Sequence, residues 1–379
     1  MSLIYLDNQA TTPLDPEVWR VMAPFYQGQF GNPGSADTSR GKAAAEAVAR
    51  AREQLGTALG ASPRDLTFTS GATEANNLAI KGAMALQAKK GRPRVLTFAS
   101  EHKCVLESVK SLADQGMEPE ILPVQRDGLI DLDALEATLD QRVGLISAMA
   151  VHNELGVVQN VAALGALAQR HGALFHCDMA QALGKIPIDL SSLPIALASF
   201  SAHKAYGPMG IGALYVRRRP RAHLAPQIHG GGQERGLRSG TLPLALIAGF
   251  GAAARLAQDC LEEELMRLWA FRDQVLHLID LQDSLHLNGH REQRVPGNLN
   301  IRFDGLSLDQ IRQGLAGFEL SRGSACTSSD LEPSYVLTAL GLDRAQAARS
   351  LRVSFGRFTT QGEVTALCQA LGSLCSPPS

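Results

Sequence analysis

Between about residue 62 and residue 217, short apolar runs alternate with longer stretches that have the apolar spacing of helices. The run Leu66–Thr69 precedes a helical pattern over residues 74–87, Arg94–Phe98 precedes one over 105–114, and Gly144–Met149 precedes one over 161–170. Strands that alternate with helices in this way form a largely parallel sheet with helices on both faces. The pattern therefore predicts an α/β fold for this part of the chain.

The pattern changes after about residue 245. Residues 244–279 form a long amphipathic stretch that predicts one or two helices. Beyond it, residues 299–303 and 351–355 alternate with period two, as half-buried strands do. A chain of 379 residues also exceeds one typical core. We therefore predict a large domain over residues 15–250 and a smaller α+β domain built from residues 1–14 and 251–379.

Composition excludes several classes of function. The net charge is −1, so no nucleic-acid or membrane-surface field is implied, and we interpret the basic cluster Arg217–Arg221 as a solvated turn. No apolar stretch approaches the ~18 residues that span a bilayer, and the N-terminus has no signal pattern. The six cysteines contain no Cys-x-x-Cys pair, which argues against a zinc knuckle or a disulfide framework. These features predict a cytoplasmic protein with free thiols and no nucleic-acid or membrane partner.

Polar residues follow the apolar runs at the points where the predicted strands end. The five residues at these positions are Thr73, His102, Asn153, Asp178 and Lys204. Ligands of open α/β sheets bind outside the carboxyl ends of the strands. We therefore expect these five side chains to meet at one edge of the sheet.

A lysine and an aspartate at the ends of neighbouring strands suit pyridoxal phosphate. Lys204 could form a Schiff base with the aldehyde of this cofactor, and Asp178 could keep its pyridine nitrogen protonated. The alternative for Lys204 alone is an ordinary surface lysine at a strand end.

The segment from Thr69 to Asn77 leads from a strand through a small-residue turn into a helix. A helix start of this kind points free N–H groups at an anion such as a phosphate. Gly71 would let the backbone approach closely, and Thr73 would add a hydroxyl. Ser201 and His203 could donate to the same phosphate. The alternative is an ordinary capped helix start, since Ser or Thr followed by Glu is a common cap.

His102 could stack on the cofactor ring and exchange protons near neutral pH. The alternative is a metal site that combines His102 and Cys104 with His176, Cys177 and Asp178. No helix-spaced pair of ligands supports that alternative, so no metal ion is expected.

Cys326 lies in the segment 321–330, which is made of small, polar and flexible residues. A structural cysteine normally has apolar neighbours, so this position favours a thiol that is used. The alternative is a thiol without a role.

Arg352 lies on the opposite face of its predicted strand from Leu351 and Val353. A guanidinium there could bind a substrate carboxylate through two hydrogen bonds. The alternative is a surface-strand arginine.

These motifs together resemble the cysteine desulfurases of the IscS/NifS group, within the class V aminotransferase family. The match runs in order from residue 5 to about residue 360. The segments that carry it are Leu6–Pro13, Ser70–Asn77, Ser201–Lys204, Gly230–Pro243, Gly323–Ser328 and Arg352–Thr360.

The resemblance implies a fold-type-I pyridoxal-phosphate enzyme with a mainly parallel seven-stranded sheet, working as a homodimer with its sites near the subunit interface. Lys204 would carry the cofactor, Asp178 would bind the pyridine nitrogen, Gln181 the ring hydroxyl, and His102 would stack on the ring and take part in catalysis. The cofactor site would also include Gly71, Ala72, Thr73, Asn153, Ser201 and His203, with Thr241 supplied by the other subunit. Asn8, Asn153 and Arg352 would bind the substrate.

The implied reaction converts L-cysteine to L-alanine and leaves a persulfide on Cys326, within a loop over about residues 321–332. The sulfur would pass to an iron–sulfur scaffold or another acceptor protein, and Cys326 could also hold an iron–sulfur cluster transiently. Two alternatives are a selenocysteine lyase or other class V enzyme, which would not depend on Cys326, and a non-catalytic partner that kept the fold. Three departures from the family pattern are His152, where Asn is common, Arg322, where a small residue is common, and a short segment after Thr360, which leaves the acceptor open.

Overall fold

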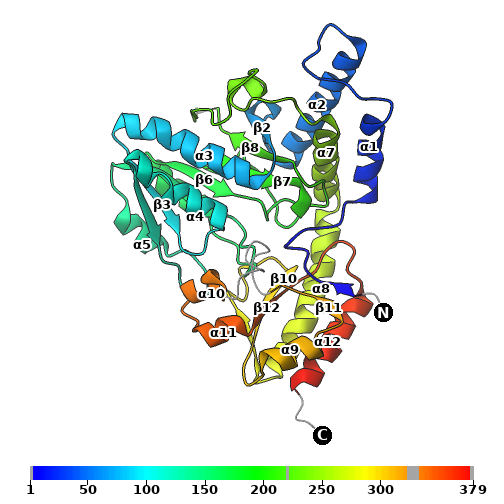
Figure 1. Ribbon diagram of the computed structural model, residues 1–379. Coiled ribbons are helices and arrows are strands. Elements are labelled where there is room, and N and C mark those ends of the chain that lie inside the picture. Colours follow the sequence, from blue (N-terminus) through cyan, green and yellow to red (C-terminus); the bar gives the residue numbers. More distant parts are fainter. Residues whose placement is uncertain (1–2, 219–221, 322–332, 376–379) are drawn as a thin grey trace.

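The computed structural model describes residues 3–218, 222–321 and 333–375, and it has two parts that lie one above the other in Figure 1. The upper part contains a seven-stranded sheet and the first seven helices. The lower part contains the remaining helices, a three-stranded sheet and the N-terminal strand. Cys326 and the rest of its predicted loop over 322–332 lie outside the described residues.

The large sheet has the strand order β2-β8-β7-β6-β5-β3-β4. Only β8 runs antiparallel to its neighbours, β2 and β7, and all other pairs are parallel. This sheet confirms the predicted α/β class with seven mainly parallel strands. The strands are β2 (Leu66–Thr69), β3 (Arg94–Phe98), β4 (Glu118–Leu122), β5 (Val143–Met149), β6 (Leu174–Asp178), β7 (Leu197–Ser201) and β8 (Gly212–Val216).

Both faces of this sheet are covered, which explains why its central strands read as continuous apolar runs. Successive side chains of a strand point to opposite faces. In β5, Leu145 belongs to one buried apolar cluster and Ile146 to another, and Val95 and Leu96 divide between the same two clusters. The helices of this part are α1 (Pro16–Tyr26), α2 (Ser39–Ala58), α3 (Ala72–Gln87), α4 (Lys103–Lys110), α5 (Leu132–Thr138), α6 (Val161–Arg170) and α7 (Leu244–Asp259).

The predicted helices occur, with shifted ends. The pattern over residues 161–170 matches α6, whereas α3 begins two residues before residue 74. The stretch predicted over 105–114 is shorter, because α4 ends at Lys110 and a 3-10 turn (Ala113–Gln115) leads to Gly116 in a left-handed conformation. The amphipathic stretch predicted over residues 244–279 forms two helices, α7 and α8 (Leu261–Asp280), with an angle of 66° between them.

In the part of the chain that is described, no single helix is long and apolar enough to cross a membrane. Only the bent α7–α8 pair meets that criterion of length and composition when both helices are taken together. Twelve of the sixteen residues of α7 are buried, so this helix packs within the fold.

The lower part is built around an antiparallel sheet of β9 (Leu285–Asn288), β10 (Asn298–Phe303) and β12 (Ser350–Ser354) in the order β12-β10-β9. Strand β1 (Ile4–Tyr5) pairs in parallel with β11 (Phe318–Glu319), so the first residues of the chain lie with the last elements. Leu6 packs in the same apolar cluster as Phe303 and Val353. The domain boundaries themselves stay a prediction. The other helices are α9 (Leu308–Gly314), α10 (Tyr335–Ala339), α11 (Arg344–Ala348) and α12 (Gln361–Cys375).

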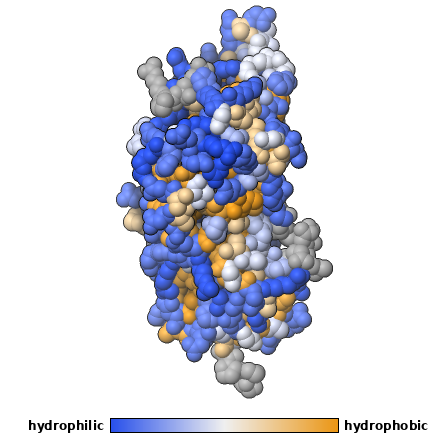
Figure 2. Space-filling view, turned by 90° about the vertical axis from the view of Figure 1, so that its left-hand side faces the viewer, coloured by the Kyte–Doolittle hydropathy of each residue, from blue (hydrophilic) through white to orange (hydrophobic). Residues whose placement is uncertain are grey.

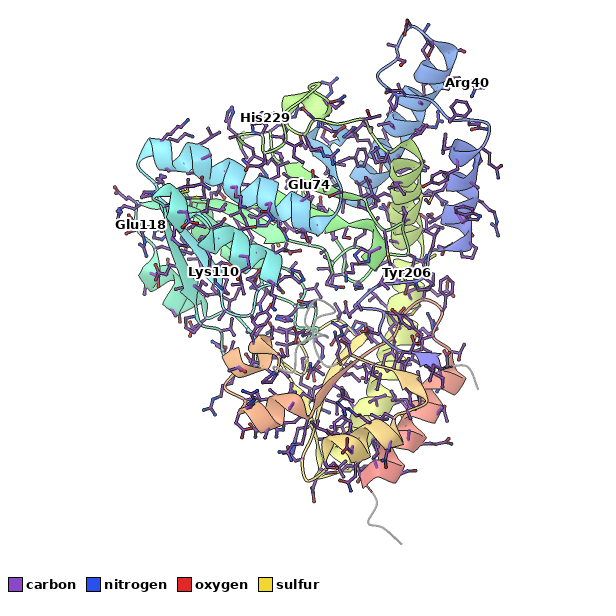
Figure 3. The ribbon with its side chains drawn as sticks, viewed as in Figure 1. Arg40, Glu74, Lys110, Glu118, Tyr206 and His229 are labelled. Atoms are coloured by element: carbon purple, nitrogen blue, oxygen red, sulfur yellow. The ribbon has the colours of Figure 1, made fainter. Side chains whose placement is uncertain are left out.

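Ion pairs join the two parts. Arg357 of the lower part binds Asp15, just before α1, at 2.7 Å and Glu264 of α8 at 2.5 Å. Its guanidinium also lies 4.4 Å from the ring centroid of Tyr206, which Figure 3 shows where the two parts meet. Figure 2 shows a largely hydrophilic face with apolar residues gathered near its middle.

A glycine at the start of β8 is predicted to be required for the close packing of three elements. A Cβ on Gly212 would lie 2.5 Å from the carbonyl oxygen of Phe200 and 2.6 Å from the Cα of Gly71. Gly212→Ala should therefore lower the free energy of unfolding by about 1–3 kcal/mol, the usual cost of overpacking, as measured by urea denaturation. The control is Gly28→Ala, whose Cβ would meet nothing within 4 Å. Equal stability of the two variants would contradict the prediction.

Candidate active site

A cavity of about 400 Å³ lies at the carboxyl ends of the parallel strands and extends to the start of α3 and to β12 of the lower part. The sequence predicted that polar residues after separate strands would meet at this edge, and the structure brings them together there. The predicted site residues that line the cavity are Gly71, Ala72, Thr73, His102, Asn153, Asp178, Gln181, Ser201, His203, Lys204 and Arg352.

Lys204 ends a 3-10 turn (Ala202–Lys204) that directly follows β7. Its Nζ donates to the carbonyl oxygen of Gln9 at 2.9 Å and to that of Ala10. The half-buried side chain is therefore held by the fold, unlike an ordinary surface lysine. Two backbone carbonyls of the N-terminal segment hold the amine at the edge of the cavity.

The N-terminal segment also holds the residue next to Lys204. Thr11 Oγ1 lies 3.0 Å from His203 Nδ1, and Thr12 Oγ1 donates to the carbonyl oxygen of His203 at 3.0 Å. Burial, followed by the positive charge of Lys204, lowers the pKa of His203 to about 4. A neutral imidazole is therefore present at this position near pH 7, and it acts as a hydrogen-bonding group without a charge.

Asp178 ends β6 and is buried. Its Oδ2 accepts a hydrogen bond of 2.7 Å from Asn76 Nδ2, and its Oδ1 accepts one of 2.9 Å from the backbone N–H of Ala180. The carboxylate is thus fixed in orientation from both sides. It faces the same cavity as Lys204, as a pyridine-binding carboxylate would have to.

The start of α3 is open to a ligand. Its N-cap is Gly71, at φ +156°, and no side chain caps its first N–H groups. Glu74, labelled on α3 in Figure 3, does not cap these groups. Its carboxylate accepts from the backbone N–H of Ser70 at 2.8 Å and pairs with Arg238 at 2.8 Å. Burial raises the pKa of Glu74, but the hydrogen bonds from Arg238 and Ser70 outweigh it and lower that pKa below its ordinary value. The free N–H groups and the helix dipole are suited to a phosphate.

His102 directly precedes α4, and its Nδ1 accepts from the backbone N–H of Cys104 at 3.2 Å. Burial lowers the pKa of His102 and outweighs the opposite effect of Asp178, and Lys204 lowers it further. The ring is therefore neutral near pH 7. A neutral imidazole at the cavity wall can accept or donate a proton.

The alternative of a metal site at His102 is not supported. Among the described residues, no group of three or more His, Cys, Asp and Glu side chains is arranged to hold a metal ion. His176 is fully buried between two hydroxyls, at 2.8 Å from Ser147 Oγ and 3.0 Å from Ser199 Oγ.

Arg352 is 1% exposed, so the alternative of a surface-strand arginine is wrong. Its Nη2 pairs with Asp7 Oδ1 at 2.5 Å, and its Nη1 donates to the carbonyl oxygen of Asn153 at 2.8 Å. Burial raises the pKa of Asp7, and the positive charge of Arg352 offsets only part of that effect. Within the described residues, Nε of Arg352 has no hydrogen-bond partner. The guanidinium is thus anchored beside the cavity, and its buried Nε–H is left without a protein partner among the described residues.

Two predicted site residues do not line this cavity. The Nδ2 of Asn8 donates to the carbonyl oxygen of Ser354 at 2.9 Å, and the side chain lies at a smaller, adjoining cavity. Thr241 is exposed and does not line this cavity. The roles predicted for both residues, and for Cys326, stay predictions.

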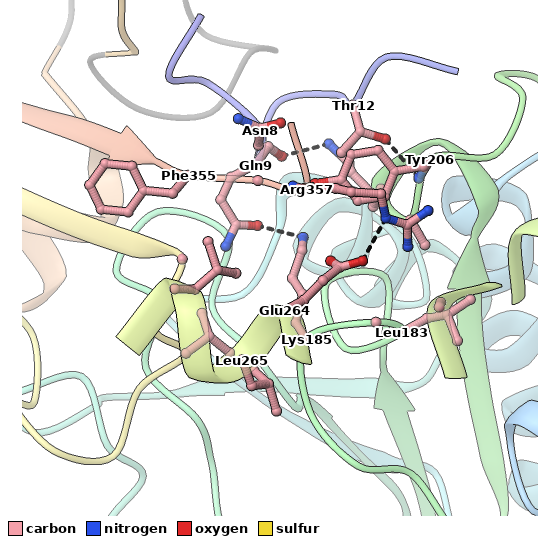
Figure 4. Close-up of a pocket in the computed structure, with 18 of the residues that line it drawn as sticks. Asn8, Gln9, Thr12, Leu183, Lys185, Tyr206, Glu264, Leu265, Phe355 and Arg357 are labelled. Atoms are coloured by element: carbon pink, nitrogen blue, oxygen red, sulfur yellow. Dashed lines mark hydrogen bonds and ion pairs between the residues drawn. The ribbon is translucent and has the colours of Figure 1, made fainter. Parts of the chain in front are cut away.

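The smaller cavity, of about 20 Å³, contains a lysine that the sequence analysis missed (Figure 4). Lys185 Nζ donates to Gln9 Oε1 at 2.9 Å and to Gln181 Oε1. Burial, followed by the charges of Lys204 and Arg352, lowers the pKa of Lys185 well below its ordinary value. The amide oxygen of Gln181 accepts the hydrogen bond from Lys185, and its amide nitrogen donates to the carbonyl oxygen of Gln9 at 2.9 Å. These two bonds fix the orientation of the Gln181 amide.

Lys185→Met is predicted to weaken binding of pyridoxal phosphate, because Gln181 would lose the bond that fixes its amide. We expect the dissociation constant to rise by about tenfold or less, the effect of about one hydrogen bond. Titration of cofactor-free protein followed by absorbance measures it. The control is Lys89→Met, since Lys89 is exposed and lies outside both cavities. An unchanged constant in Lys185→Met would contradict the role.

His152, which departs from the family pattern, has a structural environment that predicts a pH effect. It is fully buried; its Nε2 donates to the carbonyl oxygen of Ser100 at 2.8 Å, and its Nδ1 accepts from the N–H of Glu154 at 3.0 Å. Burial lowers its pKa from 6.5 to about 4. In the unfolded chain the His152 ring binds a proton below about pH 6.5, whereas in the folded chain it stays neutral down to about pH 4. The free energy of unfolding that neutral His152 supports above pH 6.5 is therefore lost as the pH falls through this window.

His152→Asn should therefore show a shallower loss of unfolding free energy between pH 6.5 and pH 4 than the parent. Urea denaturation at several pH values in this window measures the slope. Identical slopes for the two proteins would contradict the prediction.

Comparison with known proteins gives a consistent picture. The class-V aminotransferase family model matches residues 4–367. The protein named cysteine desulfurase IscS of Klebsiella pneumoniae is 48% identical over 363 residues, covering 95% of this chain and 90% of that protein. A solved NifS-like protein has a TM-score of 0.90 at 34% identity, covering 98% of this chain and 99% of its own. A structure of SspA in complex with cysteine has a TM-score of 0.83 at 36% identity, covering 94% and 100%.

Proposed function

Because this chain belongs to the class-V aminotransferase family, we propose that it is a pyridoxal-phosphate-dependent cysteine desulfurase. It would take the sulfur of L-cysteine, release L-alanine and carry the sulfur as a persulfide on Cys326. The observation that carries this proposal is a single cavity shared by the Lys204 amine, the Asp178 carboxylate and the open start of α3.

The residues present fit the cofactor. The free N–H groups of α3, with Thr73, Ser201 and His203, would hold the phosphate, and Lys204 would bind the aldehyde carbon. Asp178 would bind the pyridine nitrogen, Gln181 the ring hydroxyl, and His102 would cover one face of the ring. When bound, pyridoxal phosphate supplies a protonated ring that accepts the electron pair of the substrate's Cα–H bond. A cavity of about 400 Å³ is within the usual range for a small-molecule site.

The side chains of the protein would bind the substrate and move its protons. Arg352, anchored by Asp7, and Asn153 would bind the carboxylate of L-cysteine. Once released by the substrate amine, Lys204 would take the Cα proton, and the carbonyls of Gln9 and Ala10 would keep the amine near its starting point. Neutral His102 can donate a proton to the product.

The sulfur transfer conserves electrons without an external oxidant. The thiolate of Cys326 would form a bond to the substrate sulfur as the bond from that sulfur to Cβ breaks. The electron pair of the broken bond goes to the alanine portion, which is then protonated. An acceptor protein, such as an iron–sulfur scaffold, would remove the outer sulfur, and a cluster could be held transiently at Cys326.

The proposal includes a second copy of this chain as a partner. Met209 is 63% exposed yet lines the cavity, and Ile228 is exposed on the segment that leads to Thr241. Exposed apolar residues at the rim of a polar cavity are typical of a surface that another protein covers. We propose that a second copy supplies this surface, with Thr241 of one subunit reaching the phosphate of the other, and that the enzyme works in the cytoplasm.

Two substitutions test the reaction. Cys326→Ala should keep the visible absorbance of the bound cofactor but lose sulfide release from L-cysteine by about a hundredfold or more, the scale for removing a group that makes the new bond. Lys204→Ala should lose both the absorbance band and the activity. The control is Cys368→Ala, which replaces a thiol on α12 of the lower part.

The outcomes separate the alternatives. Sulfide release that persists in Cys326→Ala would contradict the desulfurase mechanism and favour a selenocysteine lyase or another class V enzyme. A purified parent without the cofactor band, even after addition of pyridoxal phosphate, would favour a non-catalytic protein.

A further inference from the structure

Two side chains without a role in the proposed reaction connect Asp178 to His102. Asn76 of α3 is fully buried, and its Nδ2 lies 2.7 Å from Asp178 Oδ2 and 3.1 Å from Cys104 Sγ. Cys104 Sγ in turn lies 3.0 Å from His102 Nδ1. An amide nitrogen carries two hydrogens, so Asn76 can donate to the carboxylate and to the sulfur at the same time. A continuous hydrogen-bond chain therefore joins the end of β6 to the start of α4.

The positions of the protons in this chain follow from its geometry. Nδ1 of His102 accepts the backbone N–H of Cys104, so in the neutral ring the proton is on Nε2. Burial, followed by the negative charge of Asp178, raises the pKa of Cys104 to about 12, which makes this sulfur a thiol near pH 7. A thiol has one hydrogen to donate. Asn76 and Thr73 both lower the pKa of Cys104 as hydrogen-bond donors to its sulfur, so the acceptor for the thiol hydrogen is Nδ1 of His102 at 3.0 Å.

The raised pKa of Cys104 distinguishes it from Cys326, the proposed sulfur carrier. Cys104 lines the cavity, but a thiol with a raised pKa is a poor nucleophile, and only the thiolate attacks sulfur. Asn76 and Cys104 also lie on two helices, α3 and α4, that pack against each other. Both hydrogens of Asn76 Nδ2 are engaged in this chain, whereas its buried Oδ1 has no hydrogen-bond partner among the described residues.

We propose that Cys104 is a positioning residue that, together with Asn76, holds His102 in the Nε2–H tautomer and in a fixed orientation relative to Asp178. The thiol shares the Nδ1 lone pair with the backbone N–H of Cys104, and the two donors together keep the proton off that nitrogen. The Nε2–H group is then the one available to the cavity. This inference rests on the proposed function only for its consequence, namely that His102 meets the substrate with a defined proton donor.

The test measures the tautomer directly. The full chain as purified is labelled with ¹⁵N-histidine, and long-range ¹H–¹⁵N correlation spectra at pH 7.5 report which ring nitrogen of His102 is protonated. His102→Gln assigns the signal among the ten histidines. The parent should show protonation at Nε2. Cys104→Ala should increase the fraction protonated at Nδ1 by about fivefold, the change that one ordinary hydrogen bond supports.

Conservative and remote variants complete the test. Cys104→Ser restores a donor and should keep the tautomer of the parent, and Cys368→Ala should leave the spectrum of His102 unchanged. A parent protonated at Nδ1, an unchanged tautomer in Cys104→Ala, or a shift of equal size in Cys104→Ser would each overturn the proposal. The spectrum of the parent alone shows whether Nε2 or Nδ1 of His102 is protonated, even if Cys104→Ala does not fold. Because the readout is a spectrum and not turnover, failure here is distinct from failure of the proposed reaction.

Discussion

The carbonyl oxygen of Gln9 accepts hydrogen bonds from both Lys204 Nζ and Gln181 Nε2, each at 2.9 Å, and much of the site depends on this contact. The Gln9 side chain holds Lys185, and the backbone N–H of Gln9 donates to Ser354 Oγ at 3.0 Å. One residue of the N-terminal segment therefore connects the end of β7, the turn after β6 and the last strand. A backbone carbonyl cannot change its orientation without moving the segment, so these donors are held by the fold itself and not by a flexible side chain.

Burial also determines the charge of the cavity wall. It keeps His102 and His203 of the wall neutral. It does the same for His152, which does not line the cavity, and with Asp178 it raises the pKa of Glu101, also outside the wall, well above its ordinary value. Oε1 of Glu101 accepts the N–H of Met149 at 2.8 Å. The charges that remain beside the cavity are few and anchored, such as Arg352 with Asp7. A substrate with one ammonium and one carboxylate group would meet partners that the fold already holds in place.

The sequence allowed the sheet and the wall of the cavity to be predicted, because both follow local rules. Each apolar run is a strand of one sheet, and the residue after a parallel strand reaches its carboxyl edge whatever the rest of the fold does, as Asp178 and Lys204 show. The contacts that could not be predicted are those made by tertiary structure. No local pattern reveals that a carbonyl of residue 9 receives Lys204, or that Lys185 folds back onto Gln181. Arg352 was predicted from the alternation of its strand, but its burial results from Asp7 and Asn153, which lie far away in the sequence.

The pairing of Asp7 with Arg352 spans 345 residues, and β1 pairs with β11 near residue 318. During synthesis from the N-terminus, the first segment is made before either of its partners exists. The residues that hold Lys204 can therefore take their final place only after nearly the whole chain has been translated. A truncated product that stops before β12 would keep a complete seven-stranded sheet and still lack an ordered catalytic centre, so incomplete chains would not carry out partial chemistry on free amino acids.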